Sequence, residues 1–121
     1  MDEAPRTYAG SCHCGQVRFE VRVDLSKPVN SCNCSICQRT GTMLSFVPAE
    51  AFTLQSGEEA LTDYQFGKKH LHHLFCASCG VGSFSRGLAP NGDETYAVNV
   101  RCLEGVDTSA LNIKPFDGKS L

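Results

Sequence analysis

Eight cysteines in a chain of 121 residues are the side chains best suited to do chemistry in this sequence. They form three close sets, C-x-C, C-x-C-x-x-C and C-x-x-C, with one residue apart: Cys12 and Cys14; Cys32, Cys34 and Cys37; Cys76 and Cys79; and Cys102. Such crowded thiols are awkward for disulfides, which need a particular separation and orientation of their Cα atoms. They suit a cation that gathers several thiolates at once, so the spacing favours a metal, zinc in the first place.

Two of the sets are pairs, and two pairs make a closed site. If Cys12 and Cys14 lie on a strand, residues i and i+2 point the same way and present both thiols to one point. Cys76 and Cys79 have the spacing of a zinc knuckle, and a glycine follows each pair directly, which permits a tight turn beside the metal. Four sulfurs fill a zinc tetrahedron, so we expect a structural site. The alternative is that one pair is only a buried pair of thiols.

The third set predicts a different kind of site. Cys32, Cys34 and Cys37 leave one corner of a zinc tetrahedron unfilled, and an unfilled corner distinguishes catalytic zinc from structural zinc. Cys102 could fill that corner and make the site structural. Alternatively, Cys102 shares a predicted strand face with Val98 and is a core residue. We favour the core interpretation, which leaves an open three-cysteine site.

The elements that must position these cysteines are mostly strands. Val17, Phe19, Val21 and Val23 alternate with polar residues, the pattern of a half-buried strand. Further short strand candidates cover residues 43–47, 52–55, 61–66, 70–75, 81–85 and 96–102. Residues 25–30 and 32–42 are predicted to be loops, the second with one helical turn after Ser35. Short strands between turn signals predict an all-β fold of small sheets, within a single domain spanning residues 1–121.

Charge and hydropathy limit the class of partner. The net charge is −2 and no long run of Lys or Arg occurs, which argues against nucleic acid or an anionic membrane as the main partner. The longest apolar stretches are only a few residues, too short for a membrane span, and the N-terminal MDEAPRTYAG lacks the apolar stretch of a signal peptide. We therefore expect a cytoplasmic protein, whose thiols stay reduced and available to metal.

Four ordered blocks of the sequence carry a resemblance to a known family. They are GSCHCGQVRFEV, CNCSICQRTG, HLFCASCG and NVRCLEG, and together they extend from about Gly10 to Gly105. In this order and spacing they resemble the glutathione-dependent formaldehyde-activating enzyme family, which also contains centromere protein V. The resemblance covers most of the chain.

That resemblance implies a fold, two zinc sites and an activity. The fold implied is a β-tent, built of small antiparallel sheets clamped by zinc. Cys12, Cys14, Cys76 and Cys79 match the structural zinc ligands of the family. The second, three-cysteine site matches the one where substrate is thought to bind, which makes Cys32, Cys34 and Cys37 the catalytic candidates. The reaction implied joins glutathione and formaldehyde to give S-hydroxymethylglutathione, a carbon–sulfur lyase reaction in the other direction.

The residues themselves allow three hypotheses for the function. An open three-thiolate zinc would accept the sulfur of a small thiol such as glutathione, which favours enzyme chemistry on a thiol adduct. A second closed site would favour a non-enzymatic zinc module that binds protein. A three-cysteine site that loses its zinc would expose reactive thiols, as in a redox or zinc sensor.

Overall fold

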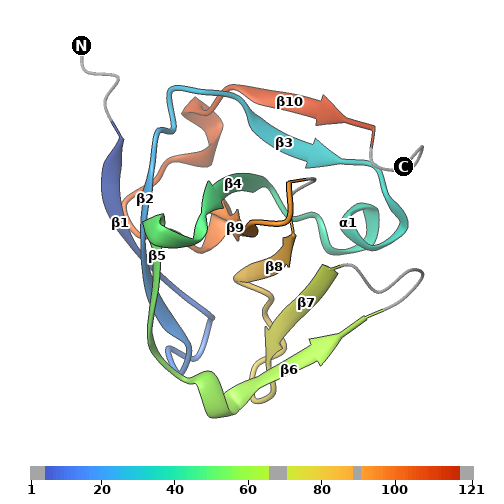
Figure 1. Ribbon diagram of the computed structural model, residues 1–121. Coiled ribbons are helices and arrows are strands. Elements are labelled where there is room, and N and C mark those ends of the chain that lie inside the picture. Colours follow the sequence, from blue (N-terminus) through green and yellow to red (C-terminus); the bar gives the residue numbers. More distant parts are fainter. Residues whose placement is uncertain (1–4, 66–70, 89–90, 118–121) are drawn as a thin grey trace.

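The structure is a computed structural model that describes residues 5–65, 71–88 and 91–117. Strands dominate these residues (Figure 1). Within these residues the strands form two sheets, one of three strands and one of seven. The expected all-β fold is confirmed. No helix of the described residues is long and apolar enough to cross a membrane.

The smaller sheet has the order β1-β2-β5 and is antiparallel throughout. Its strands are β1 (Arg6–Ser11), β2 (Arg18–Val23) and β5 (Phe52–Ser56). The central strand β2 alternates strictly between exposed and buried residues. Phe19 and Val21 are fully buried on its inner face, as the period of two in the sequence predicts.

The larger sheet has the order β10-β3-β4-β9-β8-β7-β6. Its strands are β3 (Val29–Cys32), β4 (Leu44–Pro48), β6 (Leu61–Tyr64), β7 (Leu71–Cys76), β8 (Phe84–Leu88), β9 (Glu94–Asn99) and β10 (Ile113–Phe116). All its pairings are antiparallel except that of the edge strand β10, which runs parallel to β3. Short helical turns join the strands: α1 (Ser35–Thr40), η1 (Ala49–Ala51), η2 (Glu58–Ala60), η3 (Val100–Cys102) and η4 (Thr108–Ala110).

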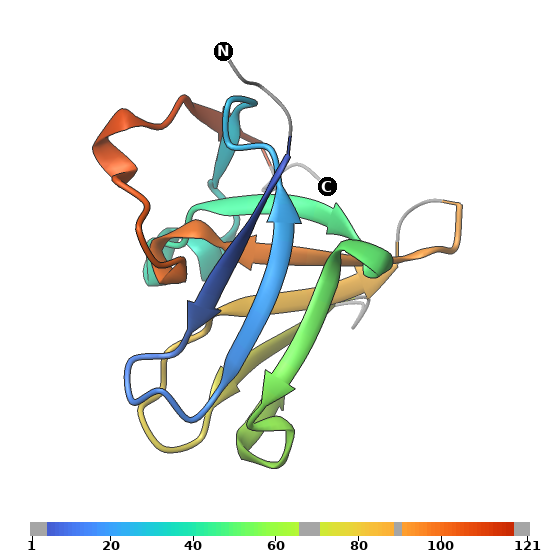
Figure 2. The same ribbon diagram turned by 90° about the vertical axis from the view of Figure 1, so that its left-hand side faces the viewer.

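The smaller sheet lies against one face of the larger one (Figure 2), and aromatic side chains from the two sheets pack together. The Phe19 ring stacks on Phe52 with centroids 5.0 Å apart, and Phe52 contacts Phe84 at 4.6 Å. Tyr96 of β9 stacks on the other side of Phe52 at 4.2 Å. Each fully buried ring of this kind contributes about 1.5–3 kcal/mol to the free energy of folding. This core holds the two sheets together, and Cys12 and Cys76 belong to it.

Several expected element boundaries differ from those observed. The predicted loop 25–30 contains the start of β3, and β8 begins at Phe84 rather than at residue 81. The prediction that Cys102 lies on a strand face was wrong, because β9 ends at Asn99 and the chain turns into η3. Neither β1 nor β10 was expected. The strand predicted over 61–66 ends at Tyr64, and residues 66 and 70 of the predicted strands lie outside the described part of the chain.

Candidate metal centres

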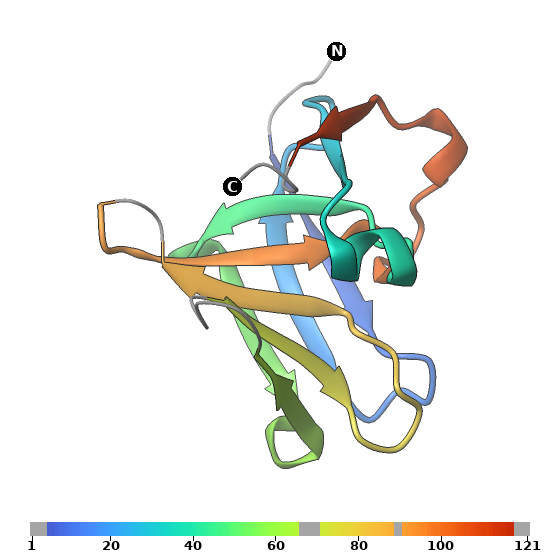
Figure 3. The ribbon, with the colours of Figure 1, turned by 90° about the vertical axis from the view of Figure 1, so that its right-hand side faces the viewer.

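The four paired cysteines come together at one end of the molecule. The loop between β1 and β2 carries Cys12 and Cys14, and the end of β7 with its following loop carries Cys76 and Cys79. These two loops lie side by side in both Figure 2 and Figure 3. The four sulfur atoms all lie within 4.8 Å of one another, a grouping that could hold a metal ion. The sequence predicted this grouping from the spacing alone.

Local backbone geometry explains how each loop brings its two thiols together. Cys12 and Cys14 lie in a turn after β1, so the expectation that they share a strand was wrong, although their thiols do converge. Gly15 and Gly80 have φ values of 83° and 79°, in the left-handed region that glycine adopts without strain. The Gly80 amide donates to the Cys76 carbonyl oxygen at 2.8 Å and closes the knuckle.

The distances between sulfur atoms fit a tetrahedral ion. Zinc–sulfur bonds of about 2.3 Å place the corners of a tetrahedron about 3.8 Å apart. The Sγ atoms of Cys12 and Cys14 are 3.6 Å apart, and those of Cys14 and Cys76 are 3.7 Å apart. A disulfide would require about 2.05 Å, and all eight cysteines are free. The donor set is therefore compatible with zinc.

Backbone amides around this group favour the thiolate form of two of the sulfurs. Hydrogen bonds from the N–H groups of Cys14 and Val81 lower the pKa of Cys79 to about 6. Burial opposes ionisation of Cys12, but the N–H of Val17, 3.3 Å from its sulfur, helps to bring its pKa below the ordinary value. Thiolates are the form that binds metal, so these amides prepare the site for a cation.

Three of the other four cysteines form a second group about the start of α1. Cys32 ends β3, Cys34 precedes the helix, and Cys37 lies in its first turn. Their sulfur atoms also lie within 4.8 Å of one another, as a site for a metal ion requires. The Cys34 amide donates to the Cys32 sulfur at 3.4 Å, and Gly41 ends the helix with a φ of 74°. The predicted helical turn after Ser35 is confirmed.

The thiols of this second group have different surroundings. Cys37 is only 9% exposed, and burial is the largest of the effects that raise its pKa to about 12. Burial also acts to raise the pKa of Cys34, but hydrogen bonding outweighs it and the net pKa lies below the usual value. The first of those bonds comes from the Cys37 amide. A bound cation would have to displace the Cys37 proton, as metal binding by cysteine always does.

An open hollow of about 610 Å³ borders this three-cysteine group. Its lining includes Cys32, Cys37 and seven other residues: Ser31, Asn33, Gln38, Gly41, Thr42, Met43 and Arg101. No carboxylate occurs among these nine residues, and Arg101 supplies the one full charge apart from the thiols. The hollow gives a small molecule access to Cys32 and Cys37. The other residues of the lining were not predicted from the sequence. The single available signal was that Arg101 stands next to Cys102 in the NVRCLEG block.

Cys102 belongs to neither group of sulfurs that could hold an ion. It lies half-buried in η3, and burial raises its pKa to about 11. The thiols that add to this rise are those of Cys12 and Cys79, both members of the four-cysteine group. The alternative in which Cys102 completes the three-cysteine site therefore finds no support in this geometry.

Asn99 connects the surroundings of the two groups, and no pattern in the sequence indicated this role. This residue is 7% exposed, and its side-chain oxygen accepts hydrogen bonds from the amides of Met43 at 3.4 Å and Arg101 at 3.2 Å. Its side-chain nitrogen donates to the Gly82 carbonyl at 3.1 Å, close after the Cys76–Cys79 knuckle. One buried amide thus fixes two residues of the hollow and the segment that leads from the knuckle into β8.

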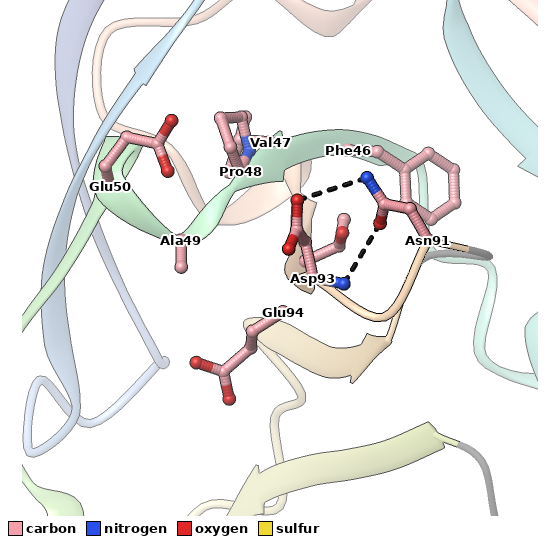
Figure 4. A pocket seen from close by; sticks show the side chains of 9 residues that line it. Phe46, Val47, Pro48, Ala49, Glu50, Asn91, Asp93 and Glu94 are labelled. Carbon is pink, nitrogen blue, oxygen red and sulfur yellow. Dashed lines mark hydrogen bonds between the residues drawn. The ribbon is translucent and has the colours of Figure 1, made fainter.

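A second hollow of about 550 Å³ lies away from the cysteines (Figure 4). Its side chains come from β4, η1, the turn before β9 and the start of β9, and they include three carboxylates, Glu50, Asp93 and Glu94. The Asn91 side chain hydrogen-bonds both the Asp93 carboxylate and the Asp93 amide, at 3.1 Å and 3.0 Å. The negative charge of this hollow contrasts with the lining of the first.

Fold and sites together define a small β-sheet protein with one group of four cysteines and one group of three. Residues 7–116 match the family model described as glutathione-dependent formaldehyde-activating enzyme. The chain belongs to this family, as the four sequence blocks indicated.

Two relatives illustrate the similarity. A Halomonas elongata protein whose name provisionally assigns it to the glutathione-dependent formaldehyde-activating enzymes is 38% identical over 82 residues. That alignment covers 58% of this chain and 50% of the relative, so the chain spans about half the length of its curated relative. A Rhodobacter sphaeroides protein of known crystal structure is 35% identical, with a TM-score of 0.75, and the match covers 88% of this chain and 97% of that one.

Proposed function

We propose that this chain is a zinc enzyme that joins glutathione, or a closely related small thiol, to formaldehyde, and that it also cleaves the carbon–sulfur bond of the adduct. The observation that carries the proposal is the three-cysteine group, which offers three sulfurs, borders an open hollow and has no fourth cysteine beside it. Family membership supports the choice of substrate. The proposal takes residues 1–121 as one domain working in a reducing compartment such as the cytoplasm.

The two cysteine groups have different roles in this proposal. Cys12, Cys14, Cys76 and Cys79 hold a structural zinc, since four sulfurs leave no position for substrate. Cys32, Cys34 and Cys37 hold a second zinc with one position left for a ligand. Zinc would keep the sulfur of a glutathione molecule bound at that free position deprotonated at neutral pH.

The chemical step is the addition of a thiolate to an aldehyde. The glutathione sulfur forms a bond to the formaldehyde carbon, and the π electrons of the carbonyl move to its oxygen, which takes a proton from water. The product is S-hydroxymethylglutathione, and the reverse path breaks the same carbon–sulfur bond. Three thiolates make any bound cation a weak Lewis acid, so most of the rate gain must come from positioning the two reactants in the hollow.

A Cys34→Ser variant tests the proposal. Cys34 is half-buried and lies outside the hydrophobic core cluster, so its replacement should remove one ligand while leaving the fold intact. We expect a fall in the rate of adduct formation of at least about 100-fold, because one missing ligand both weakens metal binding and misplaces the thiol. Exchange of isotope-labelled formaldehyde with its glutathione adduct, followed by NMR and corrected for the uncatalysed reaction, gives this rate.

Cys102→Ser is the matched control, because it removes a half-buried thiol that belongs to neither group. Its exchange rate should remain within about twofold of the unmodified protein. Elemental analysis should give two zinc ions per chain for this control and one for Cys34→Ser. Unchanged catalysis in Cys34→Ser would show that the three-cysteine group is not the reactive site.

A further inference from the structure

We propose that Arg101 is the residue that selects thiols carrying a carboxylate, by pairing its guanidinium with that carboxylate while the thiol sulfur reaches the three-cysteine group. This inference rests on the proposed function, because it names the class of substrate for the same site. It places the acid group of the substrate at the η3 side of the hollow and the sulfur at the α1 side.

Arg101 lies where its side chain can meet a ligand in the hollow. It is the single cationic residue among the nine that line the hollow, and its side chain is exposed there. Within the described part of the chain, no carboxylate forms an ion pair with its guanidinium. A guanidinium presents several N–H donors in a planar fork that matches a carboxylate, so it can form a bidentate pair with one.

Hydrogen bonds fix the backbone of Arg101. Its amide donates to the buried Asn99 side chain, and the neighbouring Val100 amide donates to the Met43 carbonyl at 2.8 Å. Met43 and Arg101 both line the hollow, so these bonds set the position of η3 relative to the segment before β4. Because the backbone is already fixed, only the side chain loses conformational entropy when it pairs with a ligand.

The charge of a zinc-loaded three-cysteine site favours a cation beside it. Three thiolates around a divalent zinc carry a net charge of about −1, and a fourth thiolate makes this about −2. A nearby cation offsets that excess, and in the hollow only Arg101 is available. The other hollow, with Glu50, Asp93 and Glu94, would instead repel an anionic thiol (Figure 4).

Two thiols of equal chain length test the inference. 3-Mercaptopropionate and 3-mercaptopropanol differ in having a carboxylate or a hydroxymethyl group, and calorimetric titration of the zinc-loaded protein gives the dissociation constant of each. We expect the unmodified protein to prefer the carboxylate by about three- to tenfold, as a partly solvated charge pair allows. Arg101→Gln should reduce this preference to about one, and Arg101→Lys should give an intermediate value because it keeps the charge but not the fork.

Arg39→Gln is the control for charge alone. Arg39 lies in the last turn of α1, its guanidinium donates to the Ser35 carbonyl, and it is not among the residues of the hollow. Its replacement should leave the preference unchanged. Each variant is compared at equal zinc content, so a change in metal loading is not mistaken for a change in selectivity.

The possible outcomes separate this inference from the proposed function. Equal affinity of the unmodified protein for both thiols, or a preference that survives in Arg101→Gln, would overturn the role of Arg101 while leaving thiol binding at the three-cysteine site intact. Failure of both thiols to bind the zinc-loaded protein would overturn the proposed function, and the inference with it.

Discussion

The two cysteine groups differ in how they join the hydrophobic core. Cys76 and Cys12 are 1% and 3% exposed and pack within the core cluster, whereas Cys14 of the same group is exposed. In the three-cysteine group Cys37 is buried and Cys34 is half-buried, and neither belongs to that cluster. The four-cysteine group is therefore continuous with the core through two of its members, whereas the three-cysteine group borders the open hollow. Substitutions at the two groups should have correspondingly different effects.

Replacement of Cys76 should affect folding rather than chemistry alone. Cys76→Ser puts a hydroxyl in a fully buried place and removes a ligand from the group that ties the β1–β2 loop to β7. We expect a loss of about 3 kcal/mol or more in the free energy of unfolding, or an insoluble product. Urea unfolding followed by circular dichroism measures the loss. Cys102→Ser is again the control, and a Cys76→Ser protein as stable as that control would contradict a structural role.

The grouping of the cysteines could be predicted from the sequence, whereas the residues that surround them could not, because only the first depends on short spacing along the chain. A tight turn brings thiols two or three residues apart onto one ion, so short spacing alone carries the information for Cys76 and Cys79. Arg101 reaches the hollow only because Asn99 holds η3 against the segment before β4. That contact joins residues more than fifty positions apart, and no local pattern encodes it.

Between elements, Asn99 forms the polar link that joins β9, the segment before β4 and the approach to β8. Asn99→Asp keeps the oxygen that accepts from Met43 and Arg101 but replaces the donor that faces the Gly82 carbonyl. A buried carboxylate beside a carbonyl oxygen should cost about 1–3 kcal/mol of stability and loosen the η3 wall of the hollow. Chemical denaturation gives the stability, and titration with 3-mercaptopropionate gives the effect on the hollow.

The same substitution at an exposed site separates buried polarity from added charge. Asn112→Asp places the same charge on the surface before β10 and should change stability by less than about 0.5 kcal/mol. Equal stability of the Asn99→Asp and Asn112→Asp proteins would mean that the link through Asn99 contributes little.

At the level of strands, the sequence predicted most of the strands but not β1, β3 or β10. β2 is covered on one face, and its alternation of apolar and polar residues reveals it. β1 lies at an edge with one fully buried residue, and β10 has none. Edge strands of this kind are held by backbone hydrogen bonds, which leave no periodic trace in the side chains. Cys102 was misplaced for a related reason, because an apolar alternation continued in the sequence beyond the last strand residue, Asn99.

For the molecule as a whole, we expect bound metal to contribute a large part of the free energy of folding. The smaller sheet meets the larger one through a modest aromatic core, and the four-cysteine group lies at one end of both sheets. Removal of zinc by a strong chelator should lower the melting temperature by about 10 °C or more, which corresponds to about 3 kcal/mol in a chain of this size. Circular dichroism with and without chelator measures the shift.

Restored zinc should recover the original melting curve, since binding to the folded state alone stabilises it by mass action. Calcium, which prefers oxygen ligands, should not recover it. An unchanged melting temperature after elemental analysis confirms full removal of zinc would show that the core alone holds the sheets together.

The separation of the paired cysteines along the chain also sets an order of events during synthesis. Cys14 and Cys76 are 62 positions apart, whereas the other group is complete within a single short segment. At about 5–20 residues per second, the first pair waits about 3–12 s for its partners to leave the ribosome. During that interval the three-cysteine group can already take up metal, and the first pair is exposed to ions that a half-formed site cannot discriminate. The order of the cysteines therefore favours metal uptake by the three-cysteine group before the four-cysteine group is complete.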